Sequence, residues 1–337
     1  MVCDSILDAV GRTPLVRLTR LFPSIPFRLY AKLESLNPGG SAKDRPATLM
    51  LQRAIEAGRV GSHTTIVESS SGNMAIGLAQ ACACLGLRLI CVVDARTTVQ
   101  HLKLLSAYGA TVEVVQTPDP TTGELLHARV ARVKALVHEI DDAFWPNQYS
   151  NPDNALAHTQ TVREICDELG EPVDYLFCAT STCGTLRGCS DAIAAHAMAT
   201  SLVAVDAFGS AIFGSARQRR LIPGHGASMR PPLVDGAHVS HVVHVSDLDC
   251  VVGCRRLVAR EGILSGGSAG GVLQAIQRMS DAIPDGALAV AILADGGERY
   301  LDTIYSDAWV AAHFGDVSHA WKGSIDAEHR QPVVAES

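Results

Sequence analysis

Short β-rich runs alternate with helix-like segments along most of this chain. Clear β-rich runs lie at residues 89–93, 111–115, 175–178, 202–205 and 288–293. Alternation of this kind predicts parallel sheets covered by helices. Residues 97–107 look like a helix that Gly109 closes before the next strand. With 337 residues, 47% of them apolar, the chain is long enough for two such α/β units around a sizeable core.

The composition of the chain indicates which kinds of molecule it binds. Acidic residues outnumber basic ones by 35 to 28, so the surface offers no strong positive field for nucleic acid or an anionic membrane. No early segment resembles a signal peptide, and no apolar run reaches the roughly 18–20 residues that span a bilayer. The ten cysteines form no CxxC pair and no dense cluster with histidine, which predicts reduced, buried thiols and no metal site. We therefore expect a cytoplasmic protein that acts on small molecules.

One lysine stands in a Gly/Ser-rich turn that runs directly into a helix-like segment. The turn covers residues 37–45 and contains Lys43, and the apolar residues 47–51 follow it. The positive end of a helix lowers the pKa of a nearby amine and favours its neutral, nucleophilic form. This pattern is typical of a Schiff-base lysine. On its own it also fits a solvated surface lysine, so the interpretation depends on the rest of the chain.

Three further turns of small residues stand at strand or helix boundaries. Residues 68–73 follow a β-rich run and precede a helix-like segment, a geometry that suits a carboxylate. Residues 179–185 repeat this order and suit a phosphate, and residues 264–271 open another helix-like segment. Any one such turn is weak evidence, because turns use glycine and serine for steric reasons. Four of them, one carrying a lysine, predict a site for an anionic small molecule.

Seven motifs, in the expected order over roughly residues 4–310, resemble the pyridoxal-phosphate enzymes of the cysteine synthase and cystathionine β-synthase group. They lie at residues 11–18, 32–34, 37–45, 70–73, 147–152, 184–185 and 297–301. The resemblance implies fold type II, with two three-layer α/β/α domains and the cofactor in the cleft between them. It implies a smaller mobile domain at 35–145, a larger domain formed by 1–34 and 146–310, and a homodimer. The tail at 311–337 is expected to be peripheral.

The resemblance also implies roles in holding pyridoxal 5'-phosphate. Lys43 matches the lysine that binds the cofactor covalently and then removes the Cα proton of the substrate. Asn73 matches the asparagine that hydrogen-bonds the ring hydroxyl, and otherwise reads as an ordinary turn residue. Ser268 matches the serine that faces the pyridine nitrogen, and otherwise reads as a helix N-cap. The phosphate loop corresponds to Ser181, Thr182, Cys183, Gly184 and Thr185, where the family more usually has glycine at positions 181 and 183.

The substrate side departs from cysteine synthase. That group typically reads Thr-Ser-Gly-Asn-Thr-Gly where this chain has Ser-Ser-Gly-Asn-Met-Ala, which predicts a reshaped pocket. Arg187 replaces a small residue and offers a cation to an anionic leaving group or a second carboxylate, although a solvated helix arginine explains it equally well. The expected substrate contacts are Ser70, Ser71, Gly72, Met74, Gln148, Tyr149 and Arg187.

The motifs look most like the 2,3-diaminopropionate branch of the family, the N-(2-amino-2-carboxyethyl)-L-glutamate synthases of siderophore pathways of the staphyloferrin B type. This resemblance implies that O-phospho-L-serine loses phosphate to leave an aminoacrylate, to which the amine of L-glutamate adds. An acceptor with two carboxylates needs cations, which Arg187, Arg129 or Arg132 would supply. Cysteine synthase and cystathionine β-synthase remain alternatives. A catalytically silent binding homologue is a third, against which the intact cofactor motifs argue.

Overall fold

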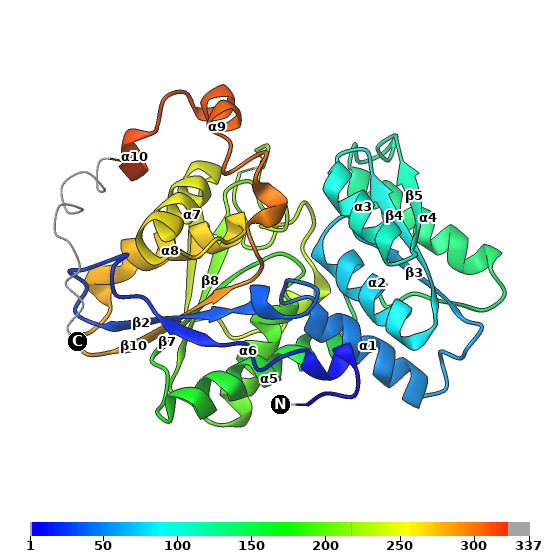
Figure 1. Cartoon of the computed structure of the whole chain (residues 1–337), viewed down its shortest axis with the longest axis horizontal. Helices are drawn as coiled ribbons and strands as arrows, with labels where there is room; N and C mark the ends of the chain where they lie inside the picture. The colour runs from blue at the N-terminus through cyan, green and yellow to red at the C-terminus, as the bar shows by residue number, and fades with distance from the viewer. Residues whose placement is uncertain (1, 217, 323–337) are drawn as a thin grey trace.

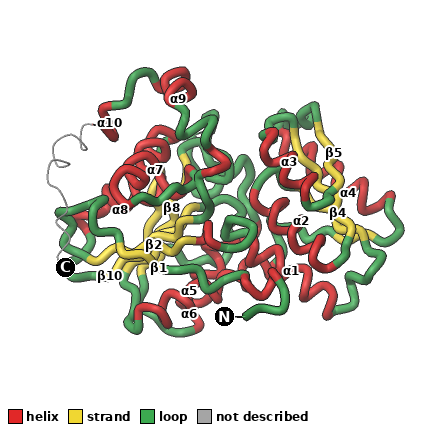
Figure 2. The backbone as a smooth tube through the Cα atoms, in the orientation of Figure 1, coloured by secondary structure: helices red, strands yellow, loops and turns green. Residues whose placement is uncertain are grey.

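The computed structural model describes residues 2–216 and 218–322, and it contains two separate sheets (Figure 1). The smaller sheet has the strand order β5-β4-β3-β6, and all its neighbouring strands are parallel. The larger has the order β1-β2-β10-β7-β8-β9; β1 runs antiparallel to β2, and the other neighbours are parallel. Figure 2 shows the strands as two yellow groups joined by helices and loops. The strands are β1 (Leu15–Arg17), β2 (Arg28–Leu33), β3 (Thr65–Ser69), β4 (Arg88–Asp94), β5 (Thr111–Val115), β6 (Ala143–Phe144), β7 (Tyr175–Ala179), β8 (Ser201–Ala207), β9 (His241–Val245) and β10 (Leu288–Leu293).

The larger sheet is buried on both faces, as its central strand shows most clearly. All six residues of β10 are buried. Leu288, Val290 and Ile292 pack with α5 (Pro152–Leu169) and α6 (Gly184–Ala195), whereas the alternate residues pack with α7 (Asp247–Glu261) and α8 (Gly267–Met279). A strand covered by helices on both sides needs apolar residues at every position. This requirement explains the continuous apolar run at 288–293.

The smaller sheet is sandwiched in the same way. On one face, Ile66 of β3 and Leu89 of β4 pack with α1 (Asp44–Glu56), α2 (Asn73–Leu85) and α3 (Val99–Ala107). On the other face, Val67 and Val92 pack against α4 (Leu125–Glu139). Helix α5 contacts both α1 and α6, so it connects the helices of the two sheets. Two helices begin where a strand ends: α2 follows the carboxyl end of β3 in the smaller sheet, and α6 follows the carboxyl end of β7 in the larger sheet.

The structure confirms the predicted fold class. Each of the five β-rich runs is a strand. Two strands, at 111–115 and 288–293, have the predicted bounds, and the other three are one to three residues longer than predicted. The predicted helix at 97–107 is α3, which begins at Val99 after the capping hydroxyl of Thr98, and Gly109 follows it with a φ of 79°. The domain boundaries at 35–145 and 146–310 stay a prediction, although every strand of the smaller sheet lies between Thr65 and Phe144.

Part of the C-terminal segment packs on the helices that cover the larger sheet. Helix α10 (His319–Lys322) contacts α7, and Asp307, the first residue of α9 (Asp307–Phe314), pairs with Arg255 of α7. Trp321 is buried, and the guanidinium of Arg255 lies 4.8 Å from its ring centroid. Residues 323–337 of the tail expected to be peripheral lie outside the described residues.

Other expectations concerned membranes, metals and thiols. Over residues 2–216 and 218–322, the structure has no helix with the length and hydropathy to cross a bilayer, and no cluster of metal-ligating side chains. All ten cysteines are unpaired, in agreement with the prediction of reduced thiols. Cys3 and Cys84 are exposed, however, so the prediction that the cysteines are buried is wrong for these two.

Candidate active site

Lys43 lies at the junction of the two units, immediately before the first residue of α1. The turn that carries it is tied to the end of β10, because the N–H of Ala42 donates to the carbonyl of Ala294 at 2.8 Å. Lys43 is half-buried. Burial lowers the pKa of its amine, while the carboxylates of Asp295 and Glu34 oppose this shift. The lysine therefore holds a more nucleophilic amine than a surface lysine does.

The turn at 181–183 faces the same pocket as Lys43. Cys183 has a φ of 65°, a left-handed conformation unusual for a residue with a side chain, and α6 begins at the next residue. The first N–H groups of a helix have no partner within the helix and attract anions. Ser268, the second residue of α8, reaches this pocket too, and α8 has no side-chain cap, so Ser268 is not an N-cap. The pocket is lined by Lys43, Cys178, Ala179, Ser181, Thr182, Cys183, Gly184, Thr185, Gly224, Ser268, Ile292 and Ala294.

The residues of this pocket fit a cofactor with a phosphate and a reactive carbonyl. A Cβ atom at Gly184 would lie 2.1 Å from the side-chain oxygen of Asn154, so only glycine allows this close approach of α5 to the turn. That Asn154 oxygen is buried and has no hydrogen-bond partner among the described residues. A lysine amine for the carbonyl and a helix N-terminus for the phosphate thus stand in one pocket.

The predicted residue Asn73 begins α2 and is held from the larger unit. Its side-chain N–H₂ donates to Asp295 at 2.8 Å, and its side-chain oxygen accepts from Arg299. Arg299 also donates to the carbonyl of Gly39, and Tyr300 donates to Asp295 at 2.6 Å. Burial raises the pKa of Asp295, and hydrogen bonds from Tyr300 and Asn73 oppose this shift. The segment that follows β10 therefore fixes the orientation of the Asn73 amide.

The residues of the loop at 70–74, all predicted substrate contacts apart from Asn73, have different surroundings. The Ser70 hydroxyl accepts from the N–H of Ala75 at 3.2 Å and so supports the first turn of α2. The Ser71 hydroxyl accepts from Arg129 at 3.2 Å. Gly72 is the N-cap of α2, with room for a side chain around it. Met74 is 2% exposed and packs in the core of the smaller sheet, so the structure does not bring it to the Lys43 pocket.

Gln148 and Tyr149 lie beside this loop and near a buried carboxyl. The Gln148 side chain donates to the carbonyl of Ser69 at 3.1 Å, and its backbone N–H donates to Glu68 at 3.2 Å. Burial raises the pKa of Glu68 to about 7. Burial also raises the pKa of Tyr149 to about 12, against the attraction of Arg129. Gln148 therefore supports the end of β3 from beneath the loop.

The three arginines predicted to bind substrate carboxylates lie in different surroundings. Arg187 pairs with Asp191 at 2.8 Å and donates to the carbonyl of Asp235, so its guanidinium is engaged on the surface of α6. Arg132 pairs with Glu113 and Glu139 on the outer side of α4. Arg129, one turn earlier on α4, reaches Ser71 instead. Of these three, only Arg129 contacts the loop at 70–74 among the described residues.

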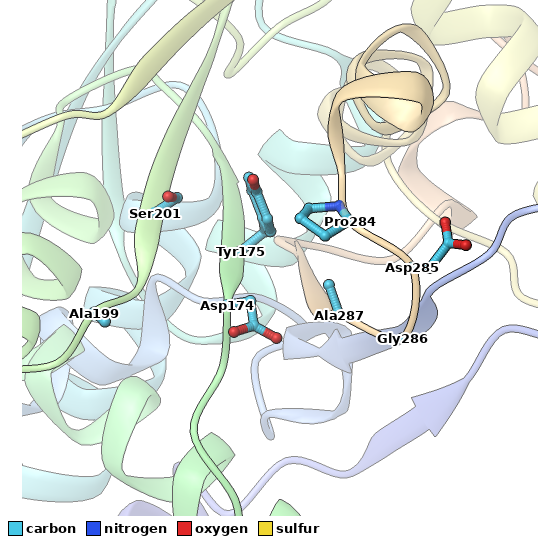
Figure 3. Close-up of a pocket in the computed structure, with 8 residues that line it drawn as sticks. All are labelled: Asp174, Tyr175, Ala199, Ser201, Pro284, Asp285, Gly286 and Ala287. Atoms are coloured by element: carbon cyan, nitrogen blue, oxygen red, sulfur yellow. The ribbon is translucent and has the colours of Figure 1, made fainter.

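A second hollow lies at the opposite end of the larger sheet, with a volume of about 460 Å³ (Figure 3). Tyr175 and Ser201 are the first residues of β7 and β8, and Ala287 directly precedes β10. In open parallel sheets, ligands bind at the carboxyl ends of strands. The hollow lies at the amino ends, and we therefore place the active site at the Lys43 pocket. The lining residues are Asp174, Tyr175, Ala199, Ser201, Pro284, Asp285, Gly286 and Ala287.

Fold and pocket together define an enzyme that binds pyridoxal phosphate between two α/β units. The model of the family described as pyridoxal-phosphate dependent enzyme matches residues 6–295. The chain belongs to this family, with the fold type II architecture of the cysteine synthase type.

Solved structures with the same fold include several enzymes of that type. An O-acetylserine dependent cystathionine beta-synthase from Helicobacter pylori is 30% identical, with a TM-score of 0.85 over 91% of this chain and 100% of that one. O-ureido-L-serine synthase is 32% identical, with a TM-score of 0.83 over 92% of this chain and 100% of its own. Cysteine synthase from Entamoeba histolytica is 30% identical, with a TM-score of 0.84 over 90% and 91%.

The sequence analysis gave no role to several residues that the structure places at the site. Asp295 and Arg299 stood in or beside a family motif but had no assigned role. Asn154 and His158 follow the motif at 147–152 on the same helix, and the spacing of four between them was a readable signal that both face one neighbour. Glu68 ends a β-rich run, and no pattern in the sequence indicates what surrounds it.

Proposed function

We propose that this enzyme catalyses a β-replacement in which O-phospho-L-serine and L-glutamate give N-(2-amino-2-carboxyethyl)-L-glutamate and phosphate, as in 2,3-diaminopropionate formation for siderophores. The C–O bond to the phosphate breaks at the serine β-carbon, a C–N bond to the glutamate amine forms there, and the amine loses a proton. The relatives named for O-acetylserine and O-ureido-L-serine support the coarser part of this proposal, since both compounds are β-substituted serines.

The roles of the pocket residues in this proposal follow from their positions. Bound pyridoxal phosphate supplies an electron sink that weakens the Cα–H bond of the amino-acid substrate. Lys43 would hold the cofactor through its amine, and the same amine would take up the Cα proton. The N-terminus of α6 and Thr185 would hold the phosphate group, and the second N–H of the Asn73 amide would donate to the ring oxygen. Ser268, which lines the pocket, would offer the ring nitrogen a neutral hydroxyl, and a neutral partner there favours elimination at the β-carbon.

The observation that carries the choice of anionic substrates is the buried guanidinium of Arg129. The residue is 8% exposed, lies 3.3 Å from Asp94 and donates to Ser71 at 3.2 Å. The 3.3 Å contact is made by Nε, which is buried and pairs with the Asp94 carboxylate without hydrogen-bond geometry. A buried cation that contacts the predicted carboxylate loop, and that the protein pairs with one carboxylate outside hydrogen-bond geometry, suits a further anionic group from a substrate. Phosphoserine and glutamate each bring one more anionic group than O-acetylserine does.

The activity is tested by supplying the purified holoenzyme with each pair of substrates. With O-phospho-L-serine and L-glutamate, we expect phosphate release in a 1:1 ratio to a product whose mass matches the glutamate adduct. If only O-acetyl-L-serine and sulfide react, giving cysteine, the protein is a cysteine synthase and the proposal fails. If homocysteine is the preferred acceptor and cystathionine forms, the cystathionine β-synthase alternative replaces it.

The role of Arg129 has a matched control on the same helix. We expect Arg129→Gln to lower kcat/KM for O-phospho-L-serine or for L-glutamate by about 10- to 100-fold, because a charge-assisted contact in a buried site contributes roughly 1.5–3 kcal/mol. Arg132→Gln, which removes a cation from the outer side of α4, leaves both values within about twofold. The substrate whose KM rises identifies the group that Arg129 binds. Equal behaviour of the two variants would exclude Arg129 from substrate recognition.

A further inference from the structure

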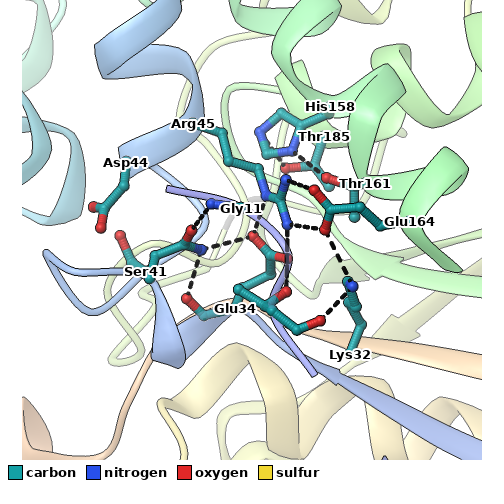
Figure 4. Close-up of polar contacts among 12 residues, drawn as sticks. Gly11, Lys32, Glu34, Ser41, Asp44, Arg45, His158, Thr161, Glu164 and Thr185 are labelled. Atoms are coloured by element: carbon teal, nitrogen blue, oxygen red, sulfur yellow. Dashed lines mark hydrogen bonds and ion pairs between the residues drawn. The ribbon is translucent and has the colours of Figure 1, made fainter. Parts of the chain in front are cut away.

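His158 lies behind the phosphate turn, between two threonine hydroxyls (Figure 4). Its Nε2 is 3.2 Å from the hydroxyl oxygen of Thr185, and its Nδ1 is 3.4 Å from that of Thr161. His158 and Thr161 are both 0% exposed, whereas Thr185 lines the Lys43 pocket. The histidine therefore connects the interior of α5 to the hydroxyl of a residue that lines the pocket.

Close packing of α5 on α6 holds this arrangement in place. At Gly188 of α6, a Cβ atom would lie 2.1 Å from the carbonyl oxygen of Ala155 and 2.7 Å from the Cβ of His158. The absence of a side chain at Gly188 thus lets the backbones approach. With α5 this close, the imidazole of His158 has little freedom to move away from Thr185.

The surroundings of the imidazole favour its neutral form. Burial lowers the pKa of His158 well below its ordinary value, and the positive charges of Lys43 and Arg45 lower it further. A neutral imidazole carries one hydrogen, so one ring nitrogen donates and the other accepts. The two threonine contacts decide which nitrogen does which.

Only one of the two arrangements satisfies both buried groups. Within the described residues, His158 is the one recorded hydrogen-bond partner of the Thr161 hydroxyl. If Thr161 donates to Nδ1, then Nε2 carries the hydrogen and donates to Thr185. In the opposite arrangement, the buried hydroxyl proton of Thr161 has no acceptor, which costs roughly 1–3 kcal/mol. In the satisfied arrangement, the Thr185 oxygen accepts from His158 and its own proton remains free to point into the pocket.

We propose that His158 is a positioning residue that directs the hydroxyl proton of Thr185 towards the cofactor phosphate. Thr161 sets the tautomer, His158 transmits it, and Thr185 acts as a hydrogen-bond donor to the anion. In the opposite arrangement, the Thr185 hydroxyl would donate its hydrogen bond to Nε2. Its lone pairs would then face a phosphate oxygen, which also carries lone pairs and cannot donate to them. The relay of three side chains thus tunes the pocket for an anion without adding a charge.

The tautomer is measured directly in the wild-type protein, and a variant is needed only to assign the signal. In a sample with ¹⁵N-labelled histidine, His158→Gln identifies the His158 signal by its disappearance. We expect the hydrogen on Nε2, both with and without pyridoxal phosphate. A hydrogen on Nδ1, or a doubly protonated ring, at neutral pH would overturn the proposal.

Cofactor affinity supplies the second test. We expect Thr161→Val to raise the Kd for pyridoxal phosphate about 10-fold in titrations of the apoprotein, because Nδ1 loses its donor and the tautomer is no longer fixed. Thr161→Ser keeps the hydroxyl and restores the affinity. Thr159→Val is the matched control: it removes a hydroxyl on the same helix that donates to the carbonyl of Leu156. An unchanged Kd in a folded Thr161→Val protein would also overturn the proposal.

Discussion

Glu68 is a fully buried carboxyl at the end of β3, directly before the loop of Ser70 and Ser71. It accepts from the indole N–H of Trp145 at 3.0 Å and from the backbone N–H of Ser69 at 2.8 Å. These donors favour the ionised form, but burial outweighs them and raises the pKa to about 7. A carboxyl whose pKa is higher in the folded state than in the unfolded state binds its proton more tightly when folded. Its ionisation therefore lowers stability as the pH rises from about 4.5 to 7.

This linkage predicts a change in the pH dependence of stability. Between pH 5 and pH 8, the free energy of unfolding of the wild type should fall by about 2 kcal/mol relative to Glu68→Gln, because glutamine does not ionise. Urea unfolding at each pH measures the free energy of unfolding of both proteins. The comparison uses only its change with pH, so a constant difference in stability between the two proteins does not affect the result. Glu139→Gln, on the exposed side of α4, serves as the control. Parallel curves for the wild type and Glu68→Gln would show that Glu68 does not titrate in this range.

At the same scale, the sequence identified some site residues and missed others for a physical reason. The turns at 37–45 and 179–185 were readable because local geometry requires small residues there, and one of them carries Lys43. The contact between Asn73 and Arg299 joins residues 226 positions apart in the chain, and no local pattern encodes it. Arg187 stood next to a predicted phosphate loop, yet its helical position directs it to Asp191 one turn away.

At the scale of elements, the packing of α5 on α6 determines the position of the phosphate turn. We predict that Gly188→Ala lowers the free energy of unfolding by about 2–3 kcal/mol, because the new methyl group would overlap the carbonyl of Ala155. The Kd for pyridoxal phosphate should rise in the same variant, since His158 moves with α5. Thermal unfolding and cofactor titration measure the two effects.

The control for this prediction lies at the C-terminal end of α5. Gly170 has a φ of 67° and nothing within 4 Å of a Cβ atom, so Gly170→Ala tests only the cost of alanine in a left-handed conformation, about 1 kcal/mol. We expect its cofactor affinity to equal that of the wild type. If Gly188→Ala matched it in both stability and affinity, the close approach of the two helices would have no role in holding the site.

The predictability of the elements follows from burial. Strands β7, β8 and β10 lie inside the larger sheet with helices on both faces, so each reads as an apolar run. Strand β9 lies at the edge, begins with the exposed His241 and Val242, and gave no such run. Strand β6 has only two residues and is defined by its pairing with β3 rather than by its sequence.

At the scale of the whole molecule, a buried ion network joins three elements that are far apart in the chain (Figure 4). Arg45 of α1 donates to Glu34, which follows β2, at 2.6 and 2.8 Å. It also donates to Glu164 of α5 at 2.7 and 2.8 Å, and Lys32 lies 3.1 Å from the same carboxylate. Because α1 begins directly after Lys43, this network fixes the catalytic turn against the larger unit.

Removal of the central cation should therefore destabilise the protein far more than removal of a surface cation from the same helix. We predict that Arg45→Met lowers the free energy of unfolding by about 3–5 kcal/mol at pH 7, because Glu34 and Glu164 stay buried without a partner charge. Arg53→Met is the control: its partner Asp153 is 3.1 Å away, but the arginine side chain is 51% exposed, so the loss should be below about 1 kcal/mol.

The pH dependence of the same pair separates a lost charge from lost packing. Burial alone would raise the pKa of Glu164, but hydrogen bonds from Arg45 lower it to about 2. A carboxyl with a lowered pKa stabilises the folded state above its ordinary pKa of about 4.5 and loses this contribution as the pH falls towards 2. The stability difference between the wild type and Arg45→Met should thus be largest near neutral pH and shrink below about pH 4.5. A difference that stayed constant down to pH 3 would mean that Arg45 contributes packing rather than charge, and that the network does not hold Lys43 electrostatically.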